Sequence, residues 1–593
     1  MLDKNWWCKE SNTPKKGRVI EDQFSRYITM KDGVKIALEI YLPEKVYYKE
    51  KFPCILLQTR YYREFDFRFP FNLFLKQPNE KMIKEFIRNG YAWITADVRG
   101  SGASTGYRKS EWSKKELGDA VEILDWITKQ SWCDGNIGAA GVSYDGACAE
   151  FLASQNHKSL KAVAPIFSVY DLYSDIAYPG GIHFEWFTRN WGKANRALDA
   201  MDLSIAFGIL GKLAVKGVKP IKGYEKILDN AKRDHEKNWD VHKEASSIKL
   251  RDDVSKYNIK LDDFSPHNRT KQINRAKVPF YTISGWWDGA YANSSKKKFQ
   301  ALKYNTKKLT LGPWDHGGHW NVSPYRKTSK IHFDFNRELI RFFDRYLKNI
   351  KNGIEDEKKV HYYTMGNEVW KEADSFPPEN ILPTKFYLRE GNQLHPIPPN
   401  ERSASDVFIN TNQNGTGERS RWNSLFNPFY KKSFYKHRKN DLKKSLVYRT
   451  QSFSEDKDLT GQAIVTIYLK VDAPDADIFV YLDETDELGR ISYITEGCLR
   501  LSMSKVISRD RTTKVPIQSF LKKDLIHIDK NRIHRVEIAL LPISYTIKKG
   551  HSLLLSLCNS DKDHFNSISE NGLKMEVYRN HTHLSELIVP FEN

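Results

Sequence analysis

A serine with glycines on both sides is the strongest candidate for chemistry in this sequence. We interpret Gly141-Val142-Ser143-Tyr144-Asp145-Gly146 as a nucleophile elbow of the G-x-S-x-G type, with Ser143 as the nucleophile. In such an elbow a strand ends abruptly, the serine takes a strained backbone conformation, and a helix begins at once. The glycines remove side chains that would collide in this tight turn. A serine held in this way can attack an acyl carbonyl and form a covalent acyl intermediate.

An alcohol becomes a nucleophile only with a base beside it, and the base needs an acid to orient it. In hydrolases with this elbow the chain order is serine, acid, histidine. Asp288 follows the apolar run 278–284, and His316 follows the run 308–311, so both are expected at the ends of strands. Asp315 and His319 stay open as rivals. We favour Asp288 and His316, because Asp315 adjoins His316 in the chain and His319 lies farther past the strand.

The elements that must position these residues follow from the pattern of apolar runs. Between residues 35 and 165, predicted strands at 54–57, 92–96 and 137–142 alternate with predicted helices at 82–88 and 116–129. This alternation favours a mainly parallel sheet with helices on both faces. We therefore predict an α/β domain in two parts, 1–169 and 273–355, split by a helical cap at 170–272. Strand-like runs dominate 356–593 and predict an all-β sandwich.

Composition narrows the class of protein. The chain has 593 residues, more than the roughly 250–300 residues that share one hydrophobic core. Its net charge of +20 is spread among interspersed acids and comes with no nucleic-acid-binding motif. The six cysteines form no CxxC pair, and no apolar stretch is long enough to span a membrane. We expect a cytoplasmic enzyme without metal or cofactor and without a nucleic-acid or membrane partner; whether it forms a homo-oligomer stays open.

Several ordered motifs resemble the cocaine esterase/NonD family of serine hydrolases, which is related to X-Pro dipeptidyl peptidases and α-amino acid ester hydrolases. Beside the elbow they are Asp97-Val98-Arg99-Gly100-Ser101-Gly102, Gly285-Trp286-Trp287-Asp288-Gly289, Gly312-Pro313-Trp314-Asp315-His316 and Val471-Asp472-Ala473-Pro474-Asp475-Ala476-Asp477. The resemblance implies an α/β-hydrolase fold with an inserted helical cap and a C-terminal jelly-roll (galactose-binding-like) domain. It also implies an oxyanion donor at Tyr61, with Tyr62 as the alternative, because Arg60 stands where the family usually has proline. The backbone N–H of Tyr144 would be the second donor.

The cap is expected to set specificity. Phe184, Phe187 and Trp191 follow a helical spacing and are candidates to line an acyl pocket with Trp287, although core packing explains them equally well. Glu185 is a candidate anchor for a substrate amine, or a solvated helix residue. We predict a serine hydrolase that cleaves small acyl esters, or amides and short peptides. The alternatives are an X-Pro dipeptidyl-peptidase-like or α-amino acid ester hydrolase/acylase activity, and a binding protein with a vestigial site.

Overall fold

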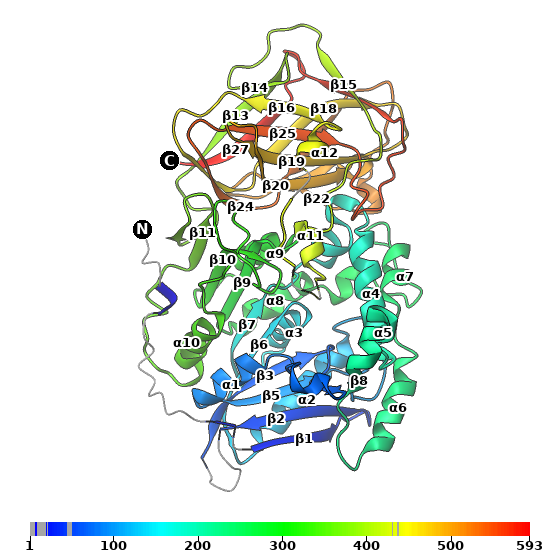
Figure 1. Cartoon of the computed structure of the whole chain (residues 1–593), viewed down its shortest axis with the longest axis vertical. Coiled ribbons are helices and arrows are strands. Elements are labelled where there is room, and N and C mark those ends of the chain that lie inside the picture. Colours follow the sequence, from blue (N-terminus) through cyan, green and yellow to red (C-terminus); the bar gives the residue numbers. More distant parts are fainter. Residues whose placement is uncertain are drawn as a thin grey trace.

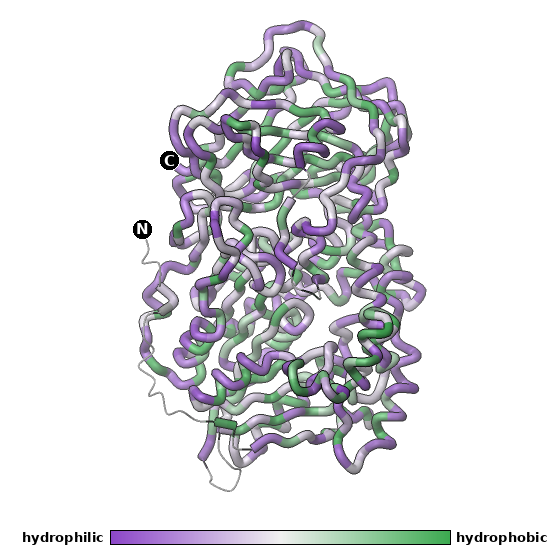
Figure 2. Tube along the Cα trace, in the orientation of Figure 1, coloured by the Kyte–Doolittle hydropathy of each residue, from purple (hydrophilic) through white to green (hydrophobic). Residues whose placement is uncertain are grey.

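The computed structural model describes residues 6–8, 19–20, 22–43, 50–427, 429, 431–435 and 438–593. In Figure 1 an α/β domain lies at the bottom, a group of cap helices at its side and an all-β domain at the top. Hydrophobic positions recur along the strands of both sheets in Figure 2, whereas the peripheral loops are mainly hydrophilic. The architecture therefore has the α/β and all-β parts that the sequence pattern predicts.

The α/β domain is built on a ten-stranded sheet with the order β1-β2-β5-β3-β6-β7-β9-β10-β11-β12. The strands from β5 through β11 in this order are parallel, whereas β1, β2 and β12 pair antiparallel at the edges. The bounds are β1 (Asp22–Thr29), β2 (Lys35–Leu42), β3 (Phe52–Thr59), β5 (Ala92–Asp97), β6 (Cys133–Val142), β7 (Leu160–Ile166), β9 (Phe280–Trp287), β10 (Lys307–Asp315), β11 (Val360–Thr364) and β12 (Val369–Ala373). Parallel strands are buried on both faces, which explains their near-continuous apolar runs.

Helices cover both faces of this sheet because alternate residues of a strand point to opposite sides. On one face, α1 (Glu80–Arg88) and α10 (Phe335–Leu347) share a buried cluster with Ile55 and Leu57 of β3. On the other face, α2 (Lys114–Thr128) shares a cluster with Cys54 and Leu56. Between β6 and β7 the chain forms α3 (Tyr144–Ala153), and α9 (Tyr291–Ala301) joins β9 to β10. Each parallel neighbour is thus reached through a helix.

Residues 170–272, predicted as a helical insertion, leave the sheet after β7 and return before β9, its neighbour in the sheet. They form a π-helical turn η4 (Tyr173–Ala177), then α4 (Glu185–Asp199), α5 (Ser204–Ala214), α6 (Glu225–His235) and α7 (Val241–Ser247), with α8 (Thr270–Ala276) completing the return. A short strand β8 (Val215–Val218) pairs with β4 (Phe65–Phe67) in the loop after β3. This ladder ties the insertion to the segment that carries Tyr61.

The first sheet extends beyond residue 355, where the sequence pattern suggests that the α/β part ends. β11 joins β10 in parallel after the crossover helix α10, and β12 adds an antiparallel edge. The apolar runs after residue 360 have the same period in either sheet, so periodicity alone cannot assign β11 and β12 to one of them.

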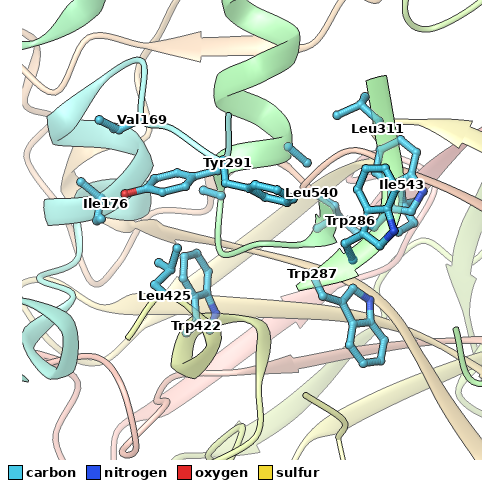
Figure 3. Packing of buried hydrophobic residues seen from close by; sticks show 14 of the residues in the cluster. Val169, Ile176, Trp286, Trp287, Tyr291, Leu311, Trp422, Leu425, Leu540 and Ile543 are labelled. Carbon is cyan, nitrogen blue, oxygen red and sulfur yellow. The ribbon is translucent and has the colours of Figure 1, made fainter. Parts of the chain in front are cut away.

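The C-terminal part forms a second, thirteen-stranded sheet that begins at β13 (Ile381–Arg389) and ends at β27 (Glu586–Glu592). Its longest strands are β13, β18 (Ile464–Val471), β19 (Asp477–Thr485) and β20 (Ile491–Arg500), and β25 (Ser552–Cys558) pairs with β19. Trp286 and Leu311 of the first sheet share a buried cluster with Leu540 and Ile543 of this domain (Figure 3). The two domains therefore meet through a continuous apolar core.

The two helical glycines Gly118 and Gly146 are expected to respond oppositely to substitution by alanine. A Cβ at Gly118 in α2 meets no atom within 4 Å, so Gly118→Ala should stabilise the protein by about 0.5–1 kcal/mol through lower chain entropy and better helix propensity. A Cβ at Gly146 in α3 would lie 2.7 Å from the Gly141 carbonyl oxygen, so Gly146→Ala should cost about 1–3 kcal/mol through overpacking. Thermal unfolding of both variants checks this pair, and an unchanged melting temperature for Gly146→Ala would contradict the close packing.

Candidate active site

The chain turns sharply at Ser143, between the last residue of β6 and the first of α3. Ser143 has φ 61° and ψ −120°, a conformation that side chains other than glycine rarely adopt. Its backbone N–H donates to the carbonyl oxygen of Ile166 at 2.9 Å, and Ile166 is the last residue of the neighbouring strand β7. The strand, the strained turn and the immediate helix are the local structure that a nucleophile elbow requires.

The glycine pattern of this elbow differs from a strict G-x-S-x-G. The second glycine, Gly146, stands three residues after Ser143, and Asp145 occupies the position two residues after it. The helix start still needs two glycines, because a Cβ at Gly141 would lie 2.5 Å from the Asp145 carbonyl carbon. Asp145 is buried, which raises the pKa of its carboxyl well above the usual range. The sequence reasoning did not single it out, although an acid where a glycine is expected was a visible signal.

Asp288 and His316 meet at the carboxyl ends of β9 and β10. His316 Nδ1 lies 2.6 Å from Asp288 Oδ1. The Asp288 carboxylate is fully buried, and its second oxygen accepts a hydrogen bond from Ser284 Oγ at 2.7 Å. Ser284 thus holds Asp288, and Asp288 holds His316 at Nδ1. The other imidazole nitrogen, Nε2, is left for a partner in the adjoining cavity.

The rival residues Asp315 and His319 shape the loop around His316. One Asp315 carboxyl oxygen accepts the backbone N–H groups of His319 at 3.0 Å and Trp320 at 2.9 Å. Burial raises the pKa of Asp315 to about 7. His319 Nδ1 lies 2.8 Å from the carbonyl oxygen of His316. These contacts hold the loop after β10, whereas the carboxylate that accepts a hydrogen bond from the His316 ring is that of Asp288.

Ser143 and His316 both line a cavity of about 300 Å³ between the sheet, the cap and the C-terminal domain. Most of its wall is apolar. The apolar residues of the wall are Trp112, Val142, Val169, Leu172, Ile176, Ala177, Phe187, Trp191, Trp239, Val241, Ala245, Leu261, Phe264, Leu425 and Phe426. Glu111 and Asp315 are the acidic residues among the described residues that line it. The cavity can therefore surround a substrate with a large apolar part.

Of the two tyrosines after β3, Tyr61 lines this cavity and Tyr62 does not. The Tyr62 hydroxyl donates to the backbone carbonyl of Leu198 at 2.6 Å, and its side chain is buried in a small cluster beneath the cap. Tyr61 instead contacts the aromatic ring of Tyr144 at 6.0 Å between centroids. Tyr144 follows Ser143 directly, so its backbone N–H lies at the first turn of α3, where helix N–H groups have no partner within the helix.

The structure brings two of the predicted pocket residues, Phe187 and Trp191, to the cavity wall. Among the described residues that line the cavity, Phe184, Glu185 and Trp287 are not found. Phe184 precedes the first residue of α4 and has a non-helical ψ of 69°, so the helical spacing does not apply to it. It is buried against Trp422 and Phe565 instead.

Glu185 and Trp287 are engaged elsewhere. Glu185 forms an ion pair with Arg189 one turn along α4. Trp287 is buried against the rings of Tyr435 and Tyr493, with centroids 5.5 Å and 5.3 Å away. Side-chain direction at the end of a strand and at the start of a helix depends on the turn, which the sequence pattern does not specify.

The C-terminal segment after residue 420 contributes to the site in a way that sequence reasoning missed. Leu425, Phe426 and Asn427 line the cavity. Just before them, the buried Arg421 donates to the backbone carbonyl of Gly289 at 2.8 Å and also to that of Trp286. The guanidinium therefore holds the loop that carries Asp288 from both sides.

One cluster outside the cavity has the residue types of a metal site. Asp171, Asp262 and His267 place a ligand atom each within 4.8 Å of one another. Arg251 forms an ion pair with Asp171 and another with Asp262 at 3.4 Å. The charge of these carboxylates is therefore already compensated by a protein cation, and the cluster is explained as a half-buried ion-pair network.

Comparison with known proteins gives the same picture. Residues 32–318 match the family model of the X-Pro dipeptidyl-peptidase (S15 family), and residues 352–586 match that of the X-Pro dipeptidyl-peptidase C-terminal non-catalytic domain. Over 95% of both chains, the protein is 37% identical to a Mycobacterium bovis protein that carries a provisional serine esterase name. It is 23% identical to the cocaine esterase of a Rhodococcus strain over 92% of both chains.

The fold has a solved counterpart in a CocE/NonD family hydrolase from Staphylococcus aureus, with a TM-score of 0.70 and 21% identity. That likeness covers 96% of this chain and 93% of the other. The predicted α/β-hydrolase fold with a C-terminal all-β domain is confirmed. No helix in the described part of the chain combines the length and the apolar composition needed to cross a membrane. The extent of these matches shows that the chain is a serine hydrolase and belongs to the CocE/NonD family of serine esterases, which is related to the X-Pro dipeptidyl-peptidases.

Proposed function

We propose that this serine hydrolase cleaves esters of uncharged, apolar carboxylic acids, with Ser143 as the nucleophile. The observation that carries this proposal is the apolar cavity in which Ser143 and His316 meet. A substrate of this kind gains free energy by leaving water, at roughly 25 cal/mol for each Å² of apolar surface that it buries. Its ester group would then lie beside Ser143 and His316.

His316 and Asp288 act as the base and its orienting acid. The hydrogen bond between Asp288 and His316 Nδ1 fixes the proton on that nitrogen, so Nε2 is free to accept the proton of Ser143. As Nε2 takes that proton, Ser143 Oγ bonds to the ester carbonyl carbon. The resulting imidazolium gives the proton to the departing alcohol, which leaves an acyl ester on Ser143. A water molecule then repeats the sequence and releases the acid.

Two donors stabilise the negative oxygen of each tetrahedral intermediate. Tyr61 lines the cavity, and the Tyr144 N–H lies at the positive end of α3, directly after the nucleophile. Donors that are already in place cost little reorganisation during the reaction, which makes this term a large part of catalysis. Tyr62 is excluded from this role in the proposal, because its hydroxyl proton is given to the Leu198 carbonyl.

The charges at the cavity argue against a substrate with a free amine. Glu111 accepts hydrogen bonds from Arg60 and from Trp239 Nε1, and Arg108 lies 3.5 Å from its second oxygen. Asp315 is occupied by two backbone N–H groups, and burial favours its neutral form. The charge of Glu111 is thus already compensated by two arginines, and Asp315 is shifted toward its neutral form, so neither acid offers an uncompensated negative charge to an ammonium group. This supports ester hydrolysis over an aminopeptidase-like reaction that would need such an anchor.

Replacing the nucleophile should abolish both labelling and turnover. A fluorophosphonate should modify the wild-type protein covalently, and Ser143→Ala should remove the modification and the hydrolysis of nitrophenyl esters while the far-UV circular dichroism stays the same. Mass spectrometry of the labelled peptide locates the modified residue. A wild-type protein that does not react would rule out the acyl-serine mechanism.

Tyr61 and Tyr62 form a matched pair for testing the oxyanion donor. Tyr61→Phe should lower kcat by about 10²–10³, the usual effect of removing one oxyanion-hole donor. Tyr62→Phe should leave kcat within a fewfold of wild type, since it removes only a structural hydrogen bond to Leu198. Steady-state kinetics on one nitrophenyl ester measures both. Equal effects of the two substitutions would contradict the assignment of Tyr61.

Substrate preference should follow the lining of the cavity. Among nitrophenyl esters, kcat/KM should rise from acetate to hexanoate, because burying each added methylene group contributes about 0.8 kcal/mol of binding free energy. An X-Pro nitroanilide, whose free amine has no anchor here, should be cleaved at least a hundredfold more slowly than the hexanoate ester. A factor of this size corresponds roughly to the loss of one hydrogen bond to a charged group. Faster cleavage of the X-Pro substrate would favour the peptidase alternative.

A further inference from the structure

The Tyr61 hydroxyl has a hydrogen-bond partner that decides where its proton can point. Trp191 Nε1 lies 3.0 Å from the Tyr61 hydroxyl oxygen. An indole N–H can only donate, so the Tyr61 oxygen must accept this bond. Among the residues that the structure describes, no acceptor takes the proton of Tyr61 itself. That proton is therefore left for an acceptor inside the cavity.

Trp191 is held in this position by a buried cation. The guanidinium carbon of Arg60 lies 5.3 Å from the centroid of the Trp191 ring, within the range of a cation–π contact. Arg60 is 1% exposed and is anchored by ion pairs with Glu111 and, at 3.5 Å, with Asp199. Phe187, one turn earlier in α4, stacks on Trp191 at 5.6 Å with an interplanar angle of 15°. Contacts with both residues restrict the rotation of the indole ring.

The same cation acts on the hydroxyl directly. Burial raises the pKa of Tyr61, and the positive charge of Arg60 opposes that rise. Arg60 also lies 6.0 Å from the ring centroid of Tyr144, the residue that supplies the second oxyanion donor. A nearby positive charge favours negative charge on a bound oxygen, and the effect is stronger where water is excluded.

We infer that Trp191 is a positioning residue of the oxyanion hole, whose indole N–H turns the Tyr61 proton toward the substrate carbonyl while Arg60 fixes the indole ring. This inference rests on the proposed role of Tyr61. It differs from a role for Trp191 as a wall of the acyl pocket, because a wall residue acts on substrate binding. A positioning residue acts on the transition state through Tyr61.

A double-mutant cycle separates these two roles. Trp191→Phe keeps an aromatic ring but removes the N–H donor. In the wild-type background it should lower kcat by about tenfold with KM within twofold, since one hydrogen bond of ordinary strength is worth roughly this factor. In a Tyr61→Phe background the same change should alter kcat by less than twofold, because the hydroxyl that Trp191 orients is gone.

The matched control is Phe187→Leu, which changes another cavity residue of α4 with no hydrogen bond to Tyr61. It should raise KM for the hexanoate ester, with the same factor in both Tyr61 backgrounds. The inference is overturned if Trp191→Phe lowers kcat equally in the two backgrounds, or if it changes only KM in a way that depends on acyl length. It is also overturned if Tyr61→Phe leaves kcat unchanged.

The Arg60 part has its own comparison. Arg60→Lys keeps the charge, whereas Arg60→Gln removes it, so kcat should fall about tenfold in Arg60→Gln and recover in part in Arg60→Lys. Should Arg60→Gln fail to fold, because it leaves Glu111 and Asp199 without their cation, Arg60→Lys against wild type decides. Its kcat should fall by less than tenfold, and Trp191→Phe should still lower kcat in that background. A loss of kcat in Arg60→Lys as large as that of Tyr61→Phe overturns this part. Fluorophosphonate labelling of Ser143 tests the proposed function separately.

Discussion

The turn at Ser143 is the constraint on which the rest of the site depends. A residue with a side chain is held at φ 61° and ψ −120°, and backbone strain of this kind typically costs about 1–3 kcal/mol. The surrounding structure must maintain it: the Ser143 N–H is bonded to Ile166 of β7, and α3 packs so closely on the end of β6 that Gly141 and Gly146 have no room for a Cβ. The direction of the hydroxyl therefore depends on the register of the whole parallel sheet.

The C-terminal domain also helps to hold the segment that carries Asp288. The loop after β9 carries Asp288, and Arg421 donates to the carbonyl of Gly289 in this loop and to that of Trp286 at the end of β9. Ser424 Oγ adds a bond to the Trp287 carbonyl at 3.0 Å. Because Leu540 and Ile543 share the apolar core with Trp286, separating the domains would expose that core and free the acid loop together. The C-terminal domain thus helps to fix the position of Asp288, although the proposed nucleophile and base lie in the α/β domain.

A group of buried charged residues lies at the wall of the cavity, near Tyr61. Arg60, Arg108, Glu111 and Asp199 form a compensated group in which both arginines are almost fully buried. Buried ion pairs contribute little net stability after desolvation, so such a group is better explained by what it positions. Here Arg60 contacts the rings of Tyr144 and Trp191, and Trp191 donates to the hydroxyl of Tyr61, the donor of the proposed oxyanion hole. The cap and the sheet are joined through these same residues.

The sequence by itself determined the candidate residues for the proposed chemistry and their order in the chain. Ser143, Asp288 and His316 could be predicted as candidates because strand ends in a parallel sheet meet at one edge, and the apolar runs that mark those strands are local features. The fold class followed from the same runs. The helical period predicted Phe187 and Trp191 at the cavity wall. It does not apply to Phe184, because the helix begins only at Glu185.

Only the tertiary structure shows which of two similar candidate residues lies at the site. Asp288 and Asp315 both follow strands, and the sequence favours Asp288 only by its place in the chain, whereas the structure shows its 2.6 Å contact with His316. Tyr61 and Tyr62 are adjacent and identical in type, yet the backbone at Tyr62, with φ 72°, sends its ring beneath the cap. Leu425–Asn427 line the cavity, and Arg421 donates to the carbonyl of Gly289, although these residues lie more than a hundred positions after Asp288 in the chain. Long-range packing sets such contacts, and local residue pattern carries no record of it.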